Sequence, residues 1–256
     1  MPETAPSKDF RAGFALFLRR QRLERWRVTA CAPLLMSSSA IIVAAGSSTR
    51  MGFDKLAAPL AGIPVLQRTL AAFLRAASID EIIMVCPPER WALLETAAAA
   101  KPIRRIDGGA TRQQSVANGL AALSPGSSLV AVHDGGRPLI HRDDIDRCVD
   151  AAADGRAVAL ARRVTETLKR ADAAGRCVAS VARDDLWLME TPQVFDTALL
   201  RNAYAEVASR QLTVTDEVSA VQAIGVPVQF IESTHPNPKI TCPADLVLAA
   251  ALLTHP

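Results

Sequence analysis

The chain has 256 residues, of which 50% are hydrophobic and 4% aromatic, with a formal net charge of +3. This length suits one large α/β domain or two small domains, and the apolar fraction allows a sizeable core. Five scattered cysteines form no C-x-x-C pair, which argues against a disulfide framework or a zinc site and favours a reducing, cytoplasmic compartment. No apolar run approaches the ~20 residues that span a bilayer, so we expect no membrane segment.

The positive charge is concentrated at the amino terminus. Residues 1–39 carry seven Lys or Arg against three acidic residues, whereas the rest of the chain carries 22 basic and 23 acidic residues. The main body therefore lacks the excess positive charge typical of a nucleic-acid-binding domain. The stretch FRAGFALFLRRQRLERWRV fits an amphipathic helix, a membrane-surface patch or a targeting peptide, and we expect it to lie outside the fold. Met36 is then a candidate for the true start.

The first predicted strand leads into a loop rich in small residues. An apolar run at Ala40–Ala45 predicts a buried strand, and residues 46–49 end it. Arg50 and Lys55 follow. Small residues let main-chain N–H groups approach an anion, and two cations can neutralise phosphate oxygens. The loop has neither the Gly-Lys-Ser/Thr of a Walker A motif nor a dinucleotide fingerprint, because Ser48 replaces the second glycine. We interpret it as a triphosphate-binding loop.

Short apolar strands and amphipathic helices alternate along the rest of the chain. The patterns predict further strands at residues 81–86, 103–106, 129–132, 157–161 and 226–231. They predict helices at residues 64–77, 90–100, 113–123, 142–153, 197–208 and 244–253, and one that Thr215 caps and that ends at Ala223. This alternation predicts an α/β fold: a single Rossmann-like, open, mostly parallel sheet with helices on both faces.

Three distinctive loops follow predicted strands, at Gly46, Gly109 and Asp134. Ligands of such sheets bind outside the carboxyl ends of the strands, so we expect these loops to converge on one edge. His133 precedes Asp134, and we expect it to pack at the end of its strand rather than to act as a ligand.

Residues 162–187 break the alternation and read as two extended pieces around a turn, which predicts a protruding β-arm. A hairpin without a core of its own is marginally stable in water, so we expect the arm to pack on another subunit of a homodimer. The domain organisation predicted is a basic extension over residues 1–39 and one domain over residues 40–256 that includes the arm.

Seven segments carry a resemblance to a known family. In order they are AAGSSTRMG with Lys55, GGATRQQSV, VHDGGRP, VTETLKR, ARDDLW with TPQVF, TVTDE and NPKITCPADL. Through them the chain resembles the 2-C-methyl-D-erythritol 4-phosphate cytidylyltransferases over nearly everything from Ala40 onward. The resemblance implies transfer of CMP from CTP to 2-C-methyl-D-erythritol 4-phosphate. The products would be 4-diphosphocytidyl-2-C-methyl-D-erythritol and pyrophosphate, in the non-mevalonate route to isoprenoids, with Mg²⁺ as cofactor.

The resemblance also implies roles for individual residues. The cations that hold the phosphates would be Arg50, Lys55 and Lys239, and the Mg²⁺ ligand would be Asp134. The residues that contact the nucleotide would be Ala44, Ala45, Gly46, Gly109 and Ser115. The residues that bind the sugar phosphate would be Arg137, Thr215 and, from the arm of the partner subunit, Thr167 and Arg183.

The chemistry agrees with these roles. Nucleotidyl transfer depends on alignment and on neutralisation of charge, and the attacking phosphate oxygen is already anionic, so no strong base is required. Cations and Mg²⁺ would counter the repulsion between that anion and the triphosphate.

Five positions depart from the family pattern: Gly135 and Gly136 where Ala-Ala is usual, Ala110 in place of an acidic residue, Glu190 where Gln is frequent, and Pro238 between Asn237 and Lys239. Two alternatives remain open. One is a ribitol-5-phosphate cytidylyltransferase, against which the arm and Thr215 argue. The other is a nucleotide-binding module without activity, against which the retained cations and Asp134 argue.

Overall fold

A computed structural model describes residues 37–47, 51–97 and 99–254. The expected extension lies outside these residues except for Ser37–Ser39, and Met36 and Arg50 lie outside them as well. The first strand, β1, spans Ser37–Val43. Residues 37–39, assigned above to the extension, therefore belong to the sheet, and the strand ends two residues earlier than expected.

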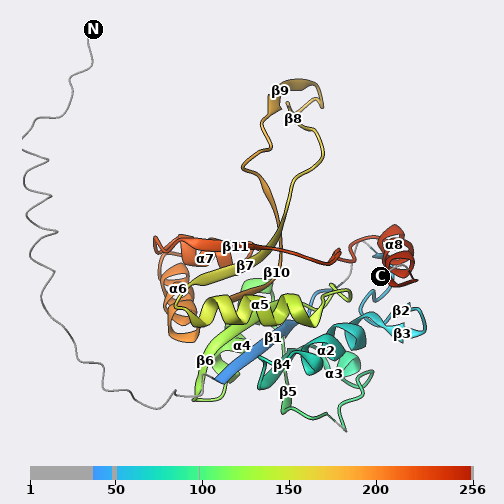
Figure 1. The fold of residues 1–256 in the computed structure, drawn as a ribbon, viewed down its shortest axis with the longest axis vertical. Coiled ribbons are helices and arrows are strands. Elements are labelled where there is room, and N and C mark those ends of the chain that lie inside the picture. Colours follow the sequence, from blue (N-terminus) through green and yellow to red (C-terminus); the bar gives the residue numbers. More distant parts are fainter. Residues whose placement is uncertain (1–36, 48–50, 98, 255–256) are drawn as a thin grey trace, which may run out of the picture. The chain divides into compact units, whose positions relative to one another are not determined.

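Seven strands form one sheet in the order β11-β7-β10-β6-β1-β4-β5 (Figure 1). Their bounds, after β1, are β4 Glu81–Val85, β5 Ile103–Ile106, β6 Ser127–Asp134, β7 Ala157–Arg163, β10 Trp187–Asp196 and β11 Val228–Glu232. All neighbouring strands in this sheet are parallel except for the two pairs that contain β10, which is antiparallel to β6 and β7. The predicted open, mostly parallel sheet is confirmed.

The helices cover both faces of the sheet, as predicted. On one face lie α2 (Val65–Arg75), α5 (Arg142–Ala153) and α8 (Pro243–Thr254), and on the other lie α4 (Arg112–Ala122), α6 (Thr197–Ser209) and α7 (Glu217–Gln222). Successive side chains of a strand point to opposite faces. Ala40 and Ile42 of β1 accordingly belong to the first core, and Ile41 to the second. This double burial explains why the strands read as continuous apolar runs.

Two hairpins stand apart from the main sheet. One joins β2 (Pro59–Leu60) to β3 (Ile63–Pro64), beside α2. The other joins β8 (Leu168–Ala171) to β9 (Cys177–Val181) inside the segment expected to form the arm, and it projects away from the sheet (Figure 1). Most side chains of β8 and β9 are exposed, so this hairpin has no core of its own.

The prediction of a helix at residues 90–100 is wrong. Among the described residues of this range, the one helix is the four-residue α3 (Pro88–Trp91). The main-chain N–H of Glu95 donates to Oε1 of Gln67 at 2.9 Å instead of to the carbonyl of Trp91, so a contact with α2 replaces the helical hydrogen bond. Tertiary contacts thus override the strong helix propensity of the ALLETAAAA run.

The expected cap of α7 is also corrected. Its N-cap is Asp216 rather than Thr215, because Oδ1 of Asp216 accepts hydrogen bonds from the main-chain N–H of Ser219 at 3.0 Å and from its hydroxyl at 2.6 Å. An aspartate supplies a charged acceptor at the positive end of the helix.

Within the part of the chain that the structure describes, no helix is long and apolar enough to cross a membrane. Four cysteines in this part are free thiols: Cys86 and Cys148 are buried, and Cys177 and Cys242 are exposed.

Candidate active site

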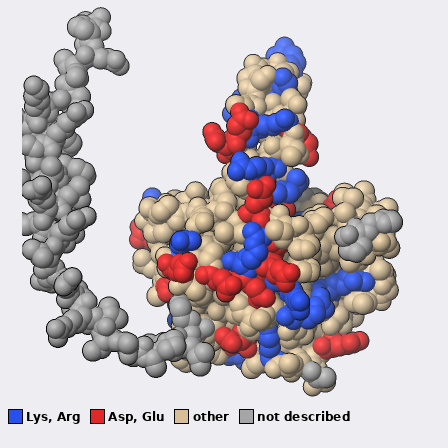
Figure 2. All heavy atoms as spheres, in the orientation of Figure 1, with Lys and Arg blue, Asp and Glu red and all other residues tan. Residues whose placement is uncertain are grey.

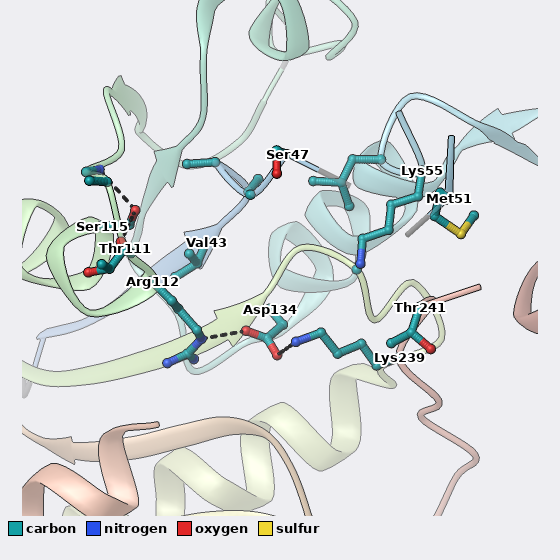
Figure 3. Close-up of a pocket in the computed structure, with 17 residues that line it drawn as sticks. Val43, Ser47, Met51, Lys55, Thr111, Arg112, Ser115, Asp134, Lys239 and Thr241 are labelled. Atoms are coloured by element: carbon teal, nitrogen blue, oxygen red, sulfur yellow. Dashed lines mark hydrogen bonds and ion pairs between the residues drawn. The ribbon is translucent and has the colours of Figure 1, made fainter. Parts of the chain in front are cut away.

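A pocket of about 430 Å³ opens at the carboxyl ends of β1 and β6 (Figure 3). Its walls come from four separate segments: the loop after β1, the turn before α4, the end of β6 and the segment before α8. The described residues that line it are Val43, Ala44, Ala45, Gly46, Ser47, Met51, Lys55, Leu56, Gly109, Ala110, Thr111, Arg112, Ser115, Asp134, Gly136, Lys239 and Thr241. The expected convergence of the strand-end loops is therefore observed.

The loop after β1 is fastened at both ends by Arg90 of α3. Its Nε atom donates to Oδ2 of Asp54 at 2.7 Å, and its Nη1 atom donates to the carbonyl oxygen of Ala44. Arg90 is buried, with 6% of its surface exposed. Ala44 begins the loop and Asp54 precedes Lys55, so this one guanidinium holds the two ends of the loop together.

The turn before α4 approaches the loop after β1 so closely that only glycine fits. A Cβ atom on Gly108 would lie 2.2 Å from the Cβ of Ala45, and one on Gly109 would lie 2.3 Å from the Cβ of Gln114. The hydroxyl of Ser115 accepts from the main-chain N–H of Gly109 at 3.0 Å. The turn is therefore held in place by α4, against the pocket.

An ionic chain runs through the middle of the pocket (Figure 3). Oδ1 of Asp134 accepts from Nε of Arg112 at 3.0 Å, and Oδ2 accepts from Nζ of Lys239 at 2.8 Å. Burial alone would raise the pKa of Asp134, but the charges of Arg112 and Lys239 outweigh it and hold that pKa well below its usual range. The carboxylate is therefore ionised at neutral pH.

Arg112 joins this chain to a buried acid. Its Nη1 and Nη2 atoms donate to the two carboxylate oxygens of Glu217 at 2.8 and 3.0 Å, and the Glu217 side chain has no exposed surface. The hydroxyl of Tyr204 also donates to Glu217, at 2.9 Å. Paired fork geometry fixes the guanidinium plane, so Arg112 links α4, α7 and the end of β6.

The two lysines are placed by the segment before α8. Nζ of Lys55 donates to the carbonyl oxygen of Ile240 at 2.7 Å, and the main-chain N–H of Ile240 donates to the carbonyl oxygen of Gly136 at 2.8 Å. Lys239 is the next residue back. The segment thus brings both lysines beside the Asp134 loop, although 184 positions separate them in the sequence.

His133 supports the loop from behind, as predicted. Its Nδ1 atom lies 2.9 Å from the hydroxyl of Thr191, which in turn accepts from the main-chain N–H of Asp134 at 3.2 Å. His133 has no exposed surface, and this burial lowers its pKa to about 3. The imidazole is therefore neutral in the folded protein at any pH well above that value.

A pH dependence of stability follows. An unfolded histidine titrates near pH 6.5, so the contribution of His133 is complete above that pH and is lost as the pH falls towards 3. As the pH falls from 6.5 to 5, we expect protonation of His133 in the unfolded chain to lower the free energy of unfolding by about 2 kcal/mol, at about 1.4 kcal/mol per pH unit. Urea unfolding of the wild type and of His133→Gln across this range measures it. An equal pH slope in both proteins would rule the effect out.

Eight of the predicted site residues line this pocket: Ala44, Ala45, Gly46, Lys55, Gly109, Ser115, Asp134 and Lys239. Arg137, expected near the sugar phosphate, does not. It is buried, and it donates to the carbonyl oxygens of Asn237 at 2.7 Å and Met189 at 3.1 Å, so it joins its own loop to the segment before α8 and to β10. Thr215 lies in a neighbouring hollow, and Thr167 and Arg183 are exposed on the arm segment.

Sequence reasoning missed Arg112. The pattern holds one signal for it: a cation in the first turn of a helix is unfavourable next to the positive end of the helix dipole, and α4 has no acid there. A basic residue at such a position indicates a carboxylate partner elsewhere in the chain. Neither Asp134 nor Glu217 could be named from that signal alone.

The two glycines that depart from the family pattern differ in their surroundings. A Cβ atom on Gly135 would lie 2.9 Å from Cδ1 of Leu66 and 3.1 Å from Cβ of Ala44, whereas one on Gly136 would meet the carbonyl oxygen of Ile240 at 3.6 Å, which is ordinary contact. Glu190 is buried, and its Oε2 atom accepts from Nδ2 of Asn237 at 3.1 Å. Ala110 lines the pocket, and its main-chain N–H donates to Oε1 of Gln114 at 2.9 Å.

An open, mostly parallel sheet with a cationic pocket at the carboxyl edge is typical of α/β proteins that bind phosphorylated ligands. The family model described as 2-C-methyl-D-erythritol 4-phosphate cytidylyltransferase matches residues 38–255. The chain belongs to this family.

Relatives and solved structures agree. The chain is 43% identical over 217 residues to the 2-C-methyl-D-erythritol 4-phosphate cytidylyltransferase of Prochlorococcus marinus (strain MIT 9313), over 83% of this chain and 96% of that one. The crystal structure of the enzyme of that name from Thermus thermophilus is 36% identical, with a TM-score of 0.71, and the match covers 86% of this chain and 100% of that one. The crystal structure of the 4-diphosphocytidyl-2C-methyl-D-erythritol synthase from Anaerococcus prevotii gives a TM-score of 0.75 at 30% identity. The match covers 86% of this chain and 99% of that one.

Proposed function

We propose that this protein transfers CMP from CTP to 2-C-methyl-D-erythritol 4-phosphate and releases pyrophosphate, in the non-mevalonate supply of isoprenoid precursors. The observation that carries the proposal is the convergence of Lys55, Arg112 and Lys239 around Asp134 in one pocket. Family membership supports the identity of the two substrates.

The residues of the pocket suit in-line attack of a phosphate oxygen on the α-phosphate of CTP. The attacking oxygen and the triphosphate repel each other, so the reaction needs cations fixed before the substrates arrive. Lys55 and Lys239 supply such charges, and main-chain groups of Ala44, Ala45 and Gly46 lie where phosphates can approach. Gly109 and Ser115 form the opposite wall, which suits the cytosine and ribose.

Mg²⁺ is part of the proposal, with Asp134 as its ligand. Each oxygen of Asp134 accepts one hydrogen bond, and a carboxylate has about four lone-pair sites, so room for a cation remains. Among the described residues, no cluster of three or more His, Cys, Asp or Glu could hold a metal alone. The phosphates of the nucleotide would supply further ligands, as is usual for Mg²⁺. The bound ion would neutralise phosphate charge.

The second part of the proposal is a homodimer built through the hairpin β8–β9. Thr167 and Arg183 beside this hairpin would then reach the sugar phosphate bound by the other subunit. The hairpin lacks a core, and Figure 2 shows basic and acidic side chains along the arm and the face beneath it. Nη1 of Arg183 donates to the carbonyl oxygen of Thr165, so its position at the base of the arm is fixed.

The arm is tested with Arg183→Ala and, as a matched control, Arg170→Ala on β8. We expect Arg183→Ala to raise KM for the sugar phosphate about tenfold while sedimentation still gives a dimer, and Arg170→Ala to leave KM unchanged. A wild-type monomer with full activity would remove this part of the proposal.

The reaction itself is tested by pyrophosphate release with CTP and Mg²⁺, with methylerythritol phosphate or ribitol 5-phosphate as the acceptor. We expect release with the first acceptor only. Release with ribitol phosphate alone would assign the rival activity. No release with either acceptor, from folded protein that binds CTP, would favour the inactive module.

We also place the protein in the cytoplasm, which the free thiols support.

Arg90 gives a separate prediction, because it fastens the loop after β1 without lining the pocket. Arg90→Leu removes the donors to Asp54 and Ala44, so we expect KM for CTP to rise about tenfold with little change in kcat. The exposed Arg156→Leu is the control. Steady-state kinetics at varied CTP measures both variants, and an unchanged KM in Arg90→Leu would show that the loop holds its shape without the clamp.

A further inference from the structure

A second cavity, of about 630 Å³, lies apart from the nucleotide pocket and shares no lining residue with it. It is lined by α2, the β2–β3 hairpin, the segment after α3, the end of α8 and two loops, which we call the 134–141 loop and the 235–241 loop. Figure 1 shows α2, the β2–β3 hairpin and α8 together at one end of the sheet. A volume of this size is typical of small-molecule sites.

The walls combine hydrocarbon with positive charge. Aliphatic side chains form most of the lining, among them Ile63, Leu139, Ile140 and Leu252. Arg68 and Arg75 of α2 add two permanent positive charges, and Glu95 is the one acidic residue among the described lining residues. Arg68 donates to the carbonyl oxygens of Leu60 at 2.7 Å and Ala61 at 3.2 Å, whereas the side chain of Arg75 has no hydrogen bond or ion pair with any described residue. An uncharged lipid would leave Arg75 without a partner, and a bare phosphate would leave the aliphatic wall without contact.

Two histidines that line the cavity lie beside the buried carboxylate of Asp144. The rings of His141 and His235 stack with centroids 4.0 Å apart, and both residues line the cavity. Nδ1 of His235 lies 3.3 Å from Oδ2 of Asp144, whose side chain has no exposed surface. Nδ1 of His235 also lies 2.9 Å from the hydroxyl of Thr234, so Nε2 is the ring nitrogen left to meet a ligand.

The two loops connect this cavity to the nucleotide pocket. In the 134–141 loop, Asp134 lines the nucleotide pocket and His141 lines the second cavity; in the 235–241 loop, Lys239 lines the first and His235 the second. The loops are joined by the guanidinium of Arg137, which donates to the carbonyl oxygen of Asn237 at 2.7 Å. A ligand that shifts His141 or His235 therefore acts on segments that carry Asp134 and Lys239.

We propose that this cavity is a regulatory site for an amphipathic anion, a phosphate, diphosphate or carboxylate joined to a short hydrocarbon chain. The anionic group lies toward the arginines and the histidine pair, and the hydrocarbon lies against the aliphatic wall. Occupancy changes the affinity for CTP through the two shared loops. Binding is measured without turnover, so its outcome does not depend on the reaction proposed above.

The test is calorimetric titration of the full-length protein, with saturating CTP present, using geranyl diphosphate and decanoate as probes. Pyrophosphate and geraniol are the half-molecule controls. We expect one or both probes to bind at least about tenfold more tightly than either control, and the tighter probe identifies the anionic group. We expect Ala71→Phe, which fills the cavity from α2, and Arg75→Gln, which removes one charge, each to weaken binding about tenfold.

CTP binding to the same protein tests the coupling. We expect the tighter probe to change the Kd for CTP about fivefold in the wild type and not in Ala71→Phe. A probe that CTP displaces completely, that binds Ala71→Phe as well as the wild type, or that binds no better than pyrophosphate or geraniol would overturn the site. A probe that binds without changing the Kd for CTP would overturn its regulatory role.

Discussion

Asp134→Asn is expected to lower kcat about 10²–10³-fold, the largest effect on activity that the site predicts. The carboxylate fixes Arg112 and Lys239 at 3.0 and 2.8 Å, and it is the proposed Mg²⁺ ligand. An amide keeps the shape but loses the charge, and its NH₂ group would point at a cation. Pyrophosphate release at saturating CTP and Mg²⁺ measures the loss.

Asp150→Asn provides the matched control, because Asp150 is an exposed acid on α5 outside the pocket. We expect it to retain wild-type kcat and stability. Circular dichroism and thermal unfolding must show that Asp134→Asn is folded. A folded Asp134→Asn protein with wild-type kcat would remove Asp134 from the catalytic machinery.

Arg112→Met is expected to lower the free energy of unfolding by about 3–5 kcal/mol, the largest effect on stability. The change leaves the fully buried carboxylate of Glu217 without its bidentate partner, and among the described side chains only that of Tyr204 still donates to it. Methionine preserves most of the side-chain volume, so the loss reports the unpaired charge rather than a cavity. Urea unfolding measures it.

Two further variants separate the explanations. Glu217→Gln combined with Arg112→Met removes both charges, and we expect the double variant to be more stable than Arg112→Met alone. Arg156→Met breaks an exposed pair with Asp154, whose atoms lie 3.8 Å apart, and should change stability by less than about 1 kcal/mol. A loss in Arg112→Met no larger than in Arg156→Met would contradict the buried-pair account.

The fold was predictable because its inner strands, such as β4 and β6, are buried on both faces. The strand at Ile103–Ile106 and the helix at Arg142–Ala153 have the bounds that the sequence predicts. Because parallel strands share the direction of their carboxyl ends, the loops that follow them meet at one edge of the sheet. The sequence therefore predicts that Gly46, Gly109 and Asp134 lie at the same edge.

What escaped prediction depends on contacts between distant segments. Helix α3 ends at Trp91, and beyond it the N–H of Glu95 donates to Gln67 of α2, a contact between distant segments that has no local signature. Arg137 follows Asp134 closely and shares its loop, yet its guanidinium turns into the interior to brace Asn237. A side chain's direction depends on the finished packing, which the sequence pattern alone does not specify.

The position of CTP in a crystal structure of the complex tests the central claim most directly. The account predicts a triphosphate between Lys55 and Lys239, beside Asp134, with the cytosine against Gly109 and Ser115. A triphosphate bound elsewhere on the protein, with these side chains still paired among themselves, would contradict it.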